Sequence, residues 1–194
     1  MVTYFNIYKN FNNSYLFYSD TSVKITKEQS FALDDFSFTV LFDDNNKIHS
    51  ITFFGNIFEN ELTKDYGFLT IEQEAKLKDI VYKANPNFIF NENKHYEYGL
   101  IIKRENHAKS DKLFVLEISF PQHKKQILTN TLYTLEGKVF PFFLAGSITA
   151  KGLAIVNSEI MGIKSEGMLA SNDSLGISEH EYDEQLKIEI EKRK

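Results

Sequence analysis

One segment of the chain, residues 160–171, gathers side chains that could contact a nucleic acid. Within it, Lys164 supplies a positive charge, Ser165 a hydroxyl group and Met168 a flexible apolar side chain. An ammonium group attracts phosphate, a hydroxyl group bonds sugar or phosphate oxygens, and an apolar side chain packs against exposed bases. These residue types therefore predict contact with the sugar–phosphate backbone and the unpaired bases of RNA.

Two glycines, Gly162 and Gly167, lie on either side of Lys164 and Ser165. A glycine inside a strand often marks a bulge or a sharp bend, for example where a barrel turns a corner. The missing side chain would also let an RNA backbone approach the protein closely. The two roles are compatible, and the sequence leaves both open.

A second segment, residues 107–113, places a short polar loop directly before an apolar run. His107 and Asp111 could form a general base with its orienting carboxylate, but a hydrogen bond that closes the loop is the preferred interpretation. Lysines lie within or near both segments. The predicted RNA-binding residues are Lys109, Lys112, Lys151, Lys164, Ser165 and Met168.

No catalytic residue, metal site or cofactor is predicted. The five histidines occur in no metal-binding spacing, and the chain has no cysteine to supply a thiolate or a disulfide. Asp43 and Asp44 could be read as an acid–base pair, but carboxylates between two apolar runs are typical of a turn. A nuclease or hydrolase is a remote alternative, because no nucleophile motif and no phosphate-binding glycine loop is present.

The composition indicates a globular protein rich in β-structure. Hydrophobic residues make up 42% and aromatic residues 14% of the 194 residues, with 18 Phe and 10 Tyr, and aromatic side chains favour strands. The absence of cysteine fits a reducing compartment. No signal peptide and no apolar run of the roughly 20 residues that a membrane helix needs is evident. We therefore expect a cytoplasmic protein with no membrane partner.

The net charge of −5 argues against a protein that coats nucleic acid through bulk positive charge. Residues 1–95 carry 9 Lys and 13 acidic residues, a charge of −4, and residues 179–194 carry 4 basic and 6 acidic residues. Residues 96–178 carry 9 basic and 8 acidic residues and are the least acidic region. Any RNA-binding surface must therefore be a local patch.

The first half of the sequence predicts an α+β domain over residues 1–95. Strands are predicted for four aromatic-rich apolar runs, at residues 2–8, 14–18, 36–42 and 47–54. Thr70 and Gln73 form a capping-box pattern. The apolar face of the helix that follows consists of Leu77, Ile80, Val81 and Ala84. Pro86 ends this helix, and the polar connector at residues 91–95 marks the domain boundary.

The second half predicts a barrel over residues 96–178. Its five apolar runs lie at residues 98–104, 113–120, 125–129, 138–144 and 163–169. Five strands without a substantial helix fit a small Greek-key barrel of the OB type. For the charged tail, residues 179–194, a short helix and a frayed end both stay open. The predicted fold is mainly β with one clear helix: an N-terminal α+β domain followed by a C-terminal OB-fold barrel.

The two polar segments resemble the best-marked parts of a known domain family. Residues 107–113 resemble the pattern H-P-x-A-D-K-L, and residues 160–171 resemble L-R-G-V-x-S-x-G-M-x-x-S. Both patterns belong to the tRNA-binding OB domain of the EMAP-II/Arc1p group, of phenylalanyl-tRNA synthetase β subunits and of YtpR-type bacterial tRNA-binding proteins. A domain with a capped helix before the OB domain is most similar to the YtpR type.

The resemblance implies a non-catalytic protein whose C-terminal OB domain binds tRNA. The chain departs from the family at four points. The proline and the alanine of the first pattern are Ala108 and Ser110, the arginine of the second pattern is Met161, and the family's G-A-x-N stretch is absent at residues 130–133. The lost phosphate-binding charge keeps a second interpretation open, a protein-interaction or dimerisation module with degenerate RNA binding. The expected partner is tRNA, and a homodimer or an aminoacyl-tRNA synthetase are the alternatives.

Overall fold

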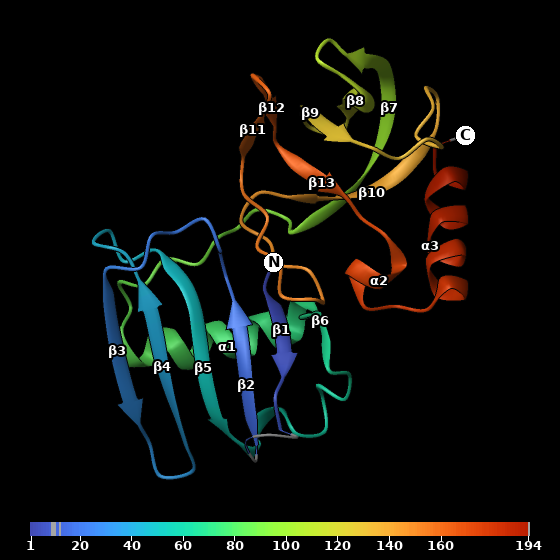
Figure 1. Cartoon of the computed structure of the whole chain (residues 1–194). Coiled ribbons are helices and arrows are strands. Elements are labelled where there is room, and N and C mark those ends of the chain that lie inside the picture. Colours follow the sequence, from blue (N-terminus) through green and yellow to red (C-terminus); the bar gives the residue numbers. More distant parts are fainter. Residues whose placement is uncertain (9–10, 12, 194) are drawn as a thin grey trace. The chain divides into compact units, whose positions relative to one another are not determined.

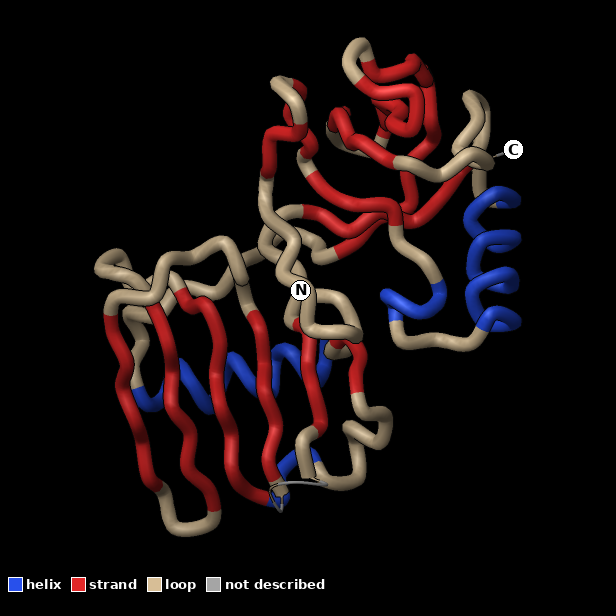
Figure 2. Tube along the Cα trace, viewed as in Figure 1, coloured by secondary structure: helices blue, strands red, loops and turns tan. Residues whose placement is uncertain are grey.

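The computed structural model describes residues 1–8, 11 and 13–193. They form two compact units, one of residues 1–95 with 146–148 and one of residues 96–145 with 149–194. Strands dominate both units, as Figure 2 shows, so the prediction of a mainly β protein is confirmed. Among the helices of the described residues, none has the length and apolar character needed to cross a membrane.

The first unit is a six-stranded antiparallel sheet with a helix against one face (Figure 1). The strands are β1 (Thr3–Asn6), β2 (Ser14–Tyr18), β3 (Lys27–Ala32), β4 (Phe36–Phe42), β5 (Ile48–Gly55) and β6 (Tyr66–Phe68). Their order is β3-β4-β5-β2-β1-β6, and a 3-10 turn, η1 (Asn56–Phe58), follows β5. Because successive strand residues point to opposite faces, alternate aromatic rings such as Phe17, Phe38 and Phe53 form the core.

Helix α1 (Ile71–Ala84) forms where the sequence predicts it. The Gln73 N–H donates to Thr70 Oγ1 (3.3 Å), and the Thr70 N–H donates to Gln73 Oε1 (2.9 Å). This capping box supplies partners for backbone groups that the first helical turn leaves unpaired. Leu77 and Val81 are fully buried against the sheet, so the predicted apolar face is the one that packs.

The sequence pattern does not predict the two edge strands, β3 and β6. Five of the six residues of β3 are exposed, so the strand carries no apolar alternation and is held by its pairing with β4. Strand β6 has only three residues. An edge strand that buries few side chains leaves almost no hydrophobic signal in the sequence, and only the sheet reveals it.

The second unit is a nearly closed five-stranded barrel of OB-like type, as predicted. Its strands are β7 (Tyr96–His107), β8 (Ser110–Ser119), β9 (Lys124–Thr129), β10 (Val139–Leu144) and β13 (Gly167–Leu169), in the order β13-β10-β7-β8-β9. The barrel closes where the Glu166 N–H donates to the Gln126 carbonyl (2.8 Å). Ile101, Leu116 and Phe142 are fully buried inside it.

The last predicted strand, residues 163–169, is two short strands in the structure. Strand β12 (Ile163–Ser165) pairs with β11 (Ser158–Ile160), whereas β13 pairs with β10. Gly167 has a φ of 156°, and a Cβ on it would lie 2.3 Å from the Phe143 carbonyl oxygen. Only glycine fits there, so the bend expected at this residue is where the chain changes strand partner.

The charged tail is a helix rather than a frayed end. After the short α2 (Asn172–Leu175), helix α3 (Glu179–Glu191) forms part of the second compact unit. Its N-cap Ser178 accepts a hydrogen bond from the Glu181 N–H (3.1 Å), and the Tyr98 hydroxyl of β7 donates to Gln185 (3.2 Å). The alternating charges of residues 179–191 therefore lie on a helix that is anchored to the barrel.

Candidate nucleic-acid interface

The two segments predicted to bind RNA meet at one edge of the barrel. The β7–β8 hairpin turns at residues 108–109, and the β11–β12 hairpin turns at residues 161–162. His107 joins them, because its Nε2 lies 3.4 Å from the Ile160 carbonyl oxygen. Segments about fifty residues apart in sequence thus form a single surface.

The hydrogen bonds of His107 define its role. The Lys109 backbone N–H donates to Nδ1 (3.0 Å), so this nitrogen carries no proton and Nε2 is the donor to Ile160. The ring is almost fully buried. The loop-closing interpretation is confirmed, with the Lys109 backbone in place of Asp111 as the partner. Both nitrogens of this ring are engaged in hydrogen bonds within the protein.

The turn of the second hairpin brings a lysine close to a backbone without a side chain. Met161 and Gly162 have φ values of 53° and 90°, the left-handed conformations of a two-residue hairpin turn. The Lys109 ammonium lies 3.7 Å from the position that a Cβ on Gly162 would occupy. The missing Cβ therefore serves the turn and also leaves room beside a positive charge.

A groove with a volume of about 590 Å³ lies between the two hairpins. It is lined by Glu105, Asn106, Ala108, Val115, Gln126, Gly162, Ile163 and Lys164. Apolar side chains, two amides and one lysine thus share a surface of a type that suits bases and phosphates together. The acidic member, Glu105, forms an ion pair with Lys103 (2.9 Å), which offsets part of its charge.

Of the six predicted RNA-binding residues, the structure brings Lys109 and Lys164 to this groove. Lys164 lines it and Lys109 lies at its rim beside Gly162. Lys112 is exposed at the start of β8 and does not line the groove. Lys151 forms an ion pair with Asp173 (3.1 Å).

Ser165 and Met168, the other two predicted residues, make their contacts within the barrel. Ser165 is 3% exposed, and its hydroxyl accepts from the Leu128 N–H (3.1 Å) and donates to the Gly167 carbonyl (3.2 Å). This hydroxyl helps to close the barrel and is not offered to a ligand. Met168 is half-buried in β13 opposite Phe143 and does not line the groove.

Two groove residues, Asn106 and Gln126, were not predicted from the sequence. The Gln126 amide nitrogen donates to the Lys164 carbonyl (2.8 Å), which fixes the side chain at the groove wall. Asn106 reaches the groove because the β7–β8 register shifts between Asn106 and His107. Neither the register shift nor the contact between hairpins leaves a signal in a single sequence.

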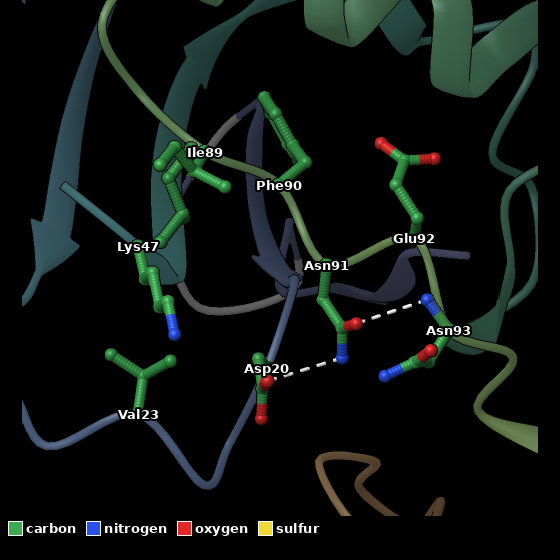
Figure 3. Close-up of a pocket in the computed structure, with 9 residues that line it drawn as sticks. Asp20, Val23, Lys47, Ile89, Phe90, Asn91, Glu92 and Asn93 are labelled. Atoms are coloured by element: carbon green, nitrogen blue, oxygen red, sulfur yellow. Dashed lines mark hydrogen bonds between the residues drawn. The ribbon is translucent and has the colours of Figure 1, made fainter. Parts of the chain in front are cut away.

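A second hollow, of about 320 Å³, lies in the first unit (Figure 3). As Figure 3 shows, Asn91 bridges its polar side chains: Asp20 accepts from the Asn91 amide (3.1 Å), and the Asn93 N–H donates to Asn91 Oδ1 (2.9 Å). Glu92 pairs with Lys78 (2.8 Å). Because these groups bond one another, the hollow is better explained as loop structure than as a ligand site.

The described ranges also contain no group of three or more His, Cys, Asp or Glu side chains that could hold a metal ion. His95 of the first unit is buried, and burial lowers its pKa to about 4. Its Nε2 donates to the Ser19 carbonyl (2.9 Å), and its Nδ1 is 2.5 Å from Thr3 Oγ1. A neutral ring with both nitrogens bonded has a structural role.

The family assignment covers the barrel and its C-terminal helices. Residues 97–192 match the family described as "Putative tRNA binding domain". This part of the chain is similar to that family. The matched range contains the whole groove and runs past residue 178 to include α3.

Two curated relatives agree with the resemblance stated from the sequence. The phenylalanine–tRNA ligase β subunit of Desulfotalea psychrophila is 33% identical over 91 residues, which are 47% of this chain and 11% of that one. The "Putative tRNA-binding protein YtpR" of Bacillus subtilis is 24% identical over 141 residues, 62% of this chain and 70% of that protein. The chain thus spans about a tenth of the synthetase subunit but most of YtpR, and the YtpR-type resemblance is confirmed.

One solved structure is also similar, the MetRS related protein from Pyrococcus horikoshii. It shows 25% sequence identity and a TM-score of 0.32, with 39% of this chain and 65% of that chain covered. A TM-score this low does not establish a common overall fold.

Proposed function

We propose that the protein is a non-catalytic tRNA-binding protein that holds RNA in the groove between the β7–β8 and β11–β12 hairpins. The observation that carries the proposal is the convergence of both motif segments on one groove inside the region that matches the tRNA-binding family. The relatives named for tRNA binding or tRNA ligation support the same ligand. Because tRNA is present in the cytoplasm, we propose that the protein is located there.

The groove suits binding of RNA through phosphate contacts and base stacking rather than through reading of a base sequence. Lys109 and Lys164 are the cations placed to neutralise phosphates, and phosphate contacts position an RNA without reading its sequence. Val115 and Ile163 offer apolar surface to an unpaired base, and the amides of Asn106 and Gln126 can reach base edges. With so few cations, affinity depends on structured RNA that presents phosphates and unpaired bases together.

The experiment is a competition assay with labelled tRNA and the full chain. Unlabelled tRNA should displace the label, whereas a DNA duplex of equal phosphate number should compete poorly, because it offers phosphates but no unpaired bases. Equal competition by the duplex would reduce the interaction to unspecific electrostatics. No binding of tRNA at low salt would overturn the proposal.

A second candidate is a protein-interaction module. The loop before β10 exposes three large apolar side chains, Leu132 (75% exposed), Tyr133 (60%) and Leu135 (50%), and contiguous exposed apolar surface is typical of protein contacts. A synthetase or a second copy of the chain would be the partner. Binding through this loop would depend weakly on salt, whereas binding through phosphates weakens steeply as salt rises.

A further inference from the structure

Arg104, one of two arginines in the chain, points to the inner face of the barrel wall. The β7–β8 register shifts between Ile101 and Lys103, so that Arg104 lies opposite Leu116. Directly opposed residues share one face of a sheet, and Leu116 is fully buried in the barrel. The neighbouring Lys103 instead remains mostly exposed and pairs with Glu105.

The guanidinium group of Arg104 is stacked on an aromatic ring. Its Cζ atom lies 3.5 Å from the centroid of the Phe114 ring, and Phe114 is 8% exposed. At this distance the planar group lies against the ring face, which attracts a cation. Phe114 covers one face of the guanidinium plane, and the Arg104 side chain stays partly exposed.

One donor of this side chain has no hydrogen-bond partner among the described residues. This donor is Arg104 Nε, which is buried. The nearby Glu136 carboxylate accepts from the Arg104 backbone N–H (2.7 Å). Buried donors almost always have a partner, so the Nε atom of Arg104 is an exception. The contact with the Phe114 ring holds the guanidinium group in place instead of a hydrogen bond from Nε.

The stack lies beside the proposed RNA groove. Asn106, two residues beyond Arg104, is the residue opposite Phe114 in the strand register and also lines the groove. Arg104, Asn106 and Phe114 therefore follow one another on the same face of the β7–β8 hairpin. Arg104 and Phe114 do not line the groove themselves, so a base would reach the guanidinium group past Asn106, at the edge of the groove.

We propose that Arg104 is a further RNA-contacting residue, and that an unpaired base stacks on the guanidinium face that Phe114 does not cover. Unpaired bases are commonly stacked on aromatic rings and on arginine planes. The inference rests on the proposed function, because it adds a stacking contact to the same site. It assigns to Phe114 the role of a positioning residue, which holds the arginine plane flat.

The test compares Arg104→Lys with Arg193→Lys in tRNA binding across a range of salt concentrations. Lysine keeps the charge but lacks the plane, so Arg104→Lys should lower affinity about tenfold, as expected for the loss of one stacked base. The slope of affinity against salt should not change, since no phosphate contact is lost. Arg193 donates to the Tyr98 carbonyl at the far end of β7, and its replacement should leave both quantities unchanged.

A second variant separates stacking from barrel stability. Phe114→Leu keeps an apolar side chain in the barrel but removes the ring, and should weaken tRNA binding to the same extent as Arg104→Lys. The double variant should then bind no more weakly than either single one. Unchanged affinity for a folded Arg104→Lys variant, with folding checked by circular dichroism, would overturn the inference while tRNA binding stands. If the wild type itself binds no tRNA, the proposed function fails first.

Discussion

At the scale of single residues, the sequence predicts the kind of site but not which side chains form it. Lys164 and Ser165 are adjacent in β12 and point to opposite faces, because strand residues alternate. Lys164 lines the groove, whereas Ser165 closes the barrel through Leu128. Both have suitable chemistry for RNA, and only the strand register tells which one faces outward.

The two groove lysines should each contribute one phosphate contact. Replacing either Lys109 or Lys164 by alanine should flatten the dependence of log affinity on log salt by about one unit. Lys151→Ala is the matched control, because Lys151 is also exposed but pairs with Asp173 and does not line the groove. Equal effects of all three replacements, measured by tRNA titration, would mean that the site is misplaced.

His95 should make the stability of the first unit depend on pH. Burial lowers its pKa to about 4 in the folded state, against about 6.5 in an unfolded chain. As pH falls, the unfolded state therefore binds the proton first. The contribution of neutral His95 to the free energy of unfolding is fully present above about pH 6.5 and is lost as pH falls toward 4. The loss over this window is on the order of 3 kcal/mol.

Denaturant unfolding between pH 7.5 and pH 4 measures this effect. His95→Asn should be less stable at neutral pH, because it cannot reproduce both ring hydrogen bonds, but its stability should vary less over the window. A variant with the same pH profile as the wild type would assign the dependence to other groups.

At the scale of elements, the sequence predicts those that bury a regular apolar pattern. Helix α1 and the long strands of the barrel have such a pattern, and they form where expected. Strand β3 exposes five of six residues, and β12 and β13 are three residues each. Strand β3 is held by its pairing with β4 and leaves no local pattern, whereas the apolar run at residues 163–169 predicts a strand but not its division between β12 and β13.

Gly167 should be the residue on which the change of strand partner between β12 and β13 depends. An alanine there would place its Cβ 2.3 Å from the Phe143 carbonyl oxygen, so Gly167→Ala should lower the free energy of unfolding by about 2–4 kcal/mol. Gly137→Ala is the control, since Gly137 also has a positive φ (77°) but nothing within 4 Å of its Cβ position. It should cost about 1 kcal/mol. Equal losses in denaturant unfolding would show that backbone strain, not the clash, limits this position.

At the scale of the whole molecule, the chain combines an aromatic-rich sheet and helix unit with a barrel unit. The strand patterns and the polar connector predict separate domains at residues 1–95 and 96–178. The compact units follow a similar division, but residues 146–148 group with the first unit and residues 179–193 with the second. Thr21 donates to the Gly146 carbonyl (2.8 Å), a contact distant in sequence that no local pattern could predict.

If the two halves are separate domains, limited proteolysis should cut first near residues 91–96. A polar connector between two cores is the usual place for such a cut. The fragment that begins near residue 96 should keep the circular dichroism of folded β-structure. Cleavage that begins within the strands of either core, with no stable fragment, would contradict independent folding.

The central claim, that tRNA lies in the groove between the two hairpins of the barrel, is tested most directly by cross-linking. Ultraviolet irradiation of tRNA bound to the full chain, followed by peptide mapping, should place cross-links in residues 104–109, near Gln126 and in residues 161–164. Excess unlabelled tRNA should abolish them. Cross-links confined to residues 1–95, or to the loop with Leu132 and Tyr133, would contradict the account.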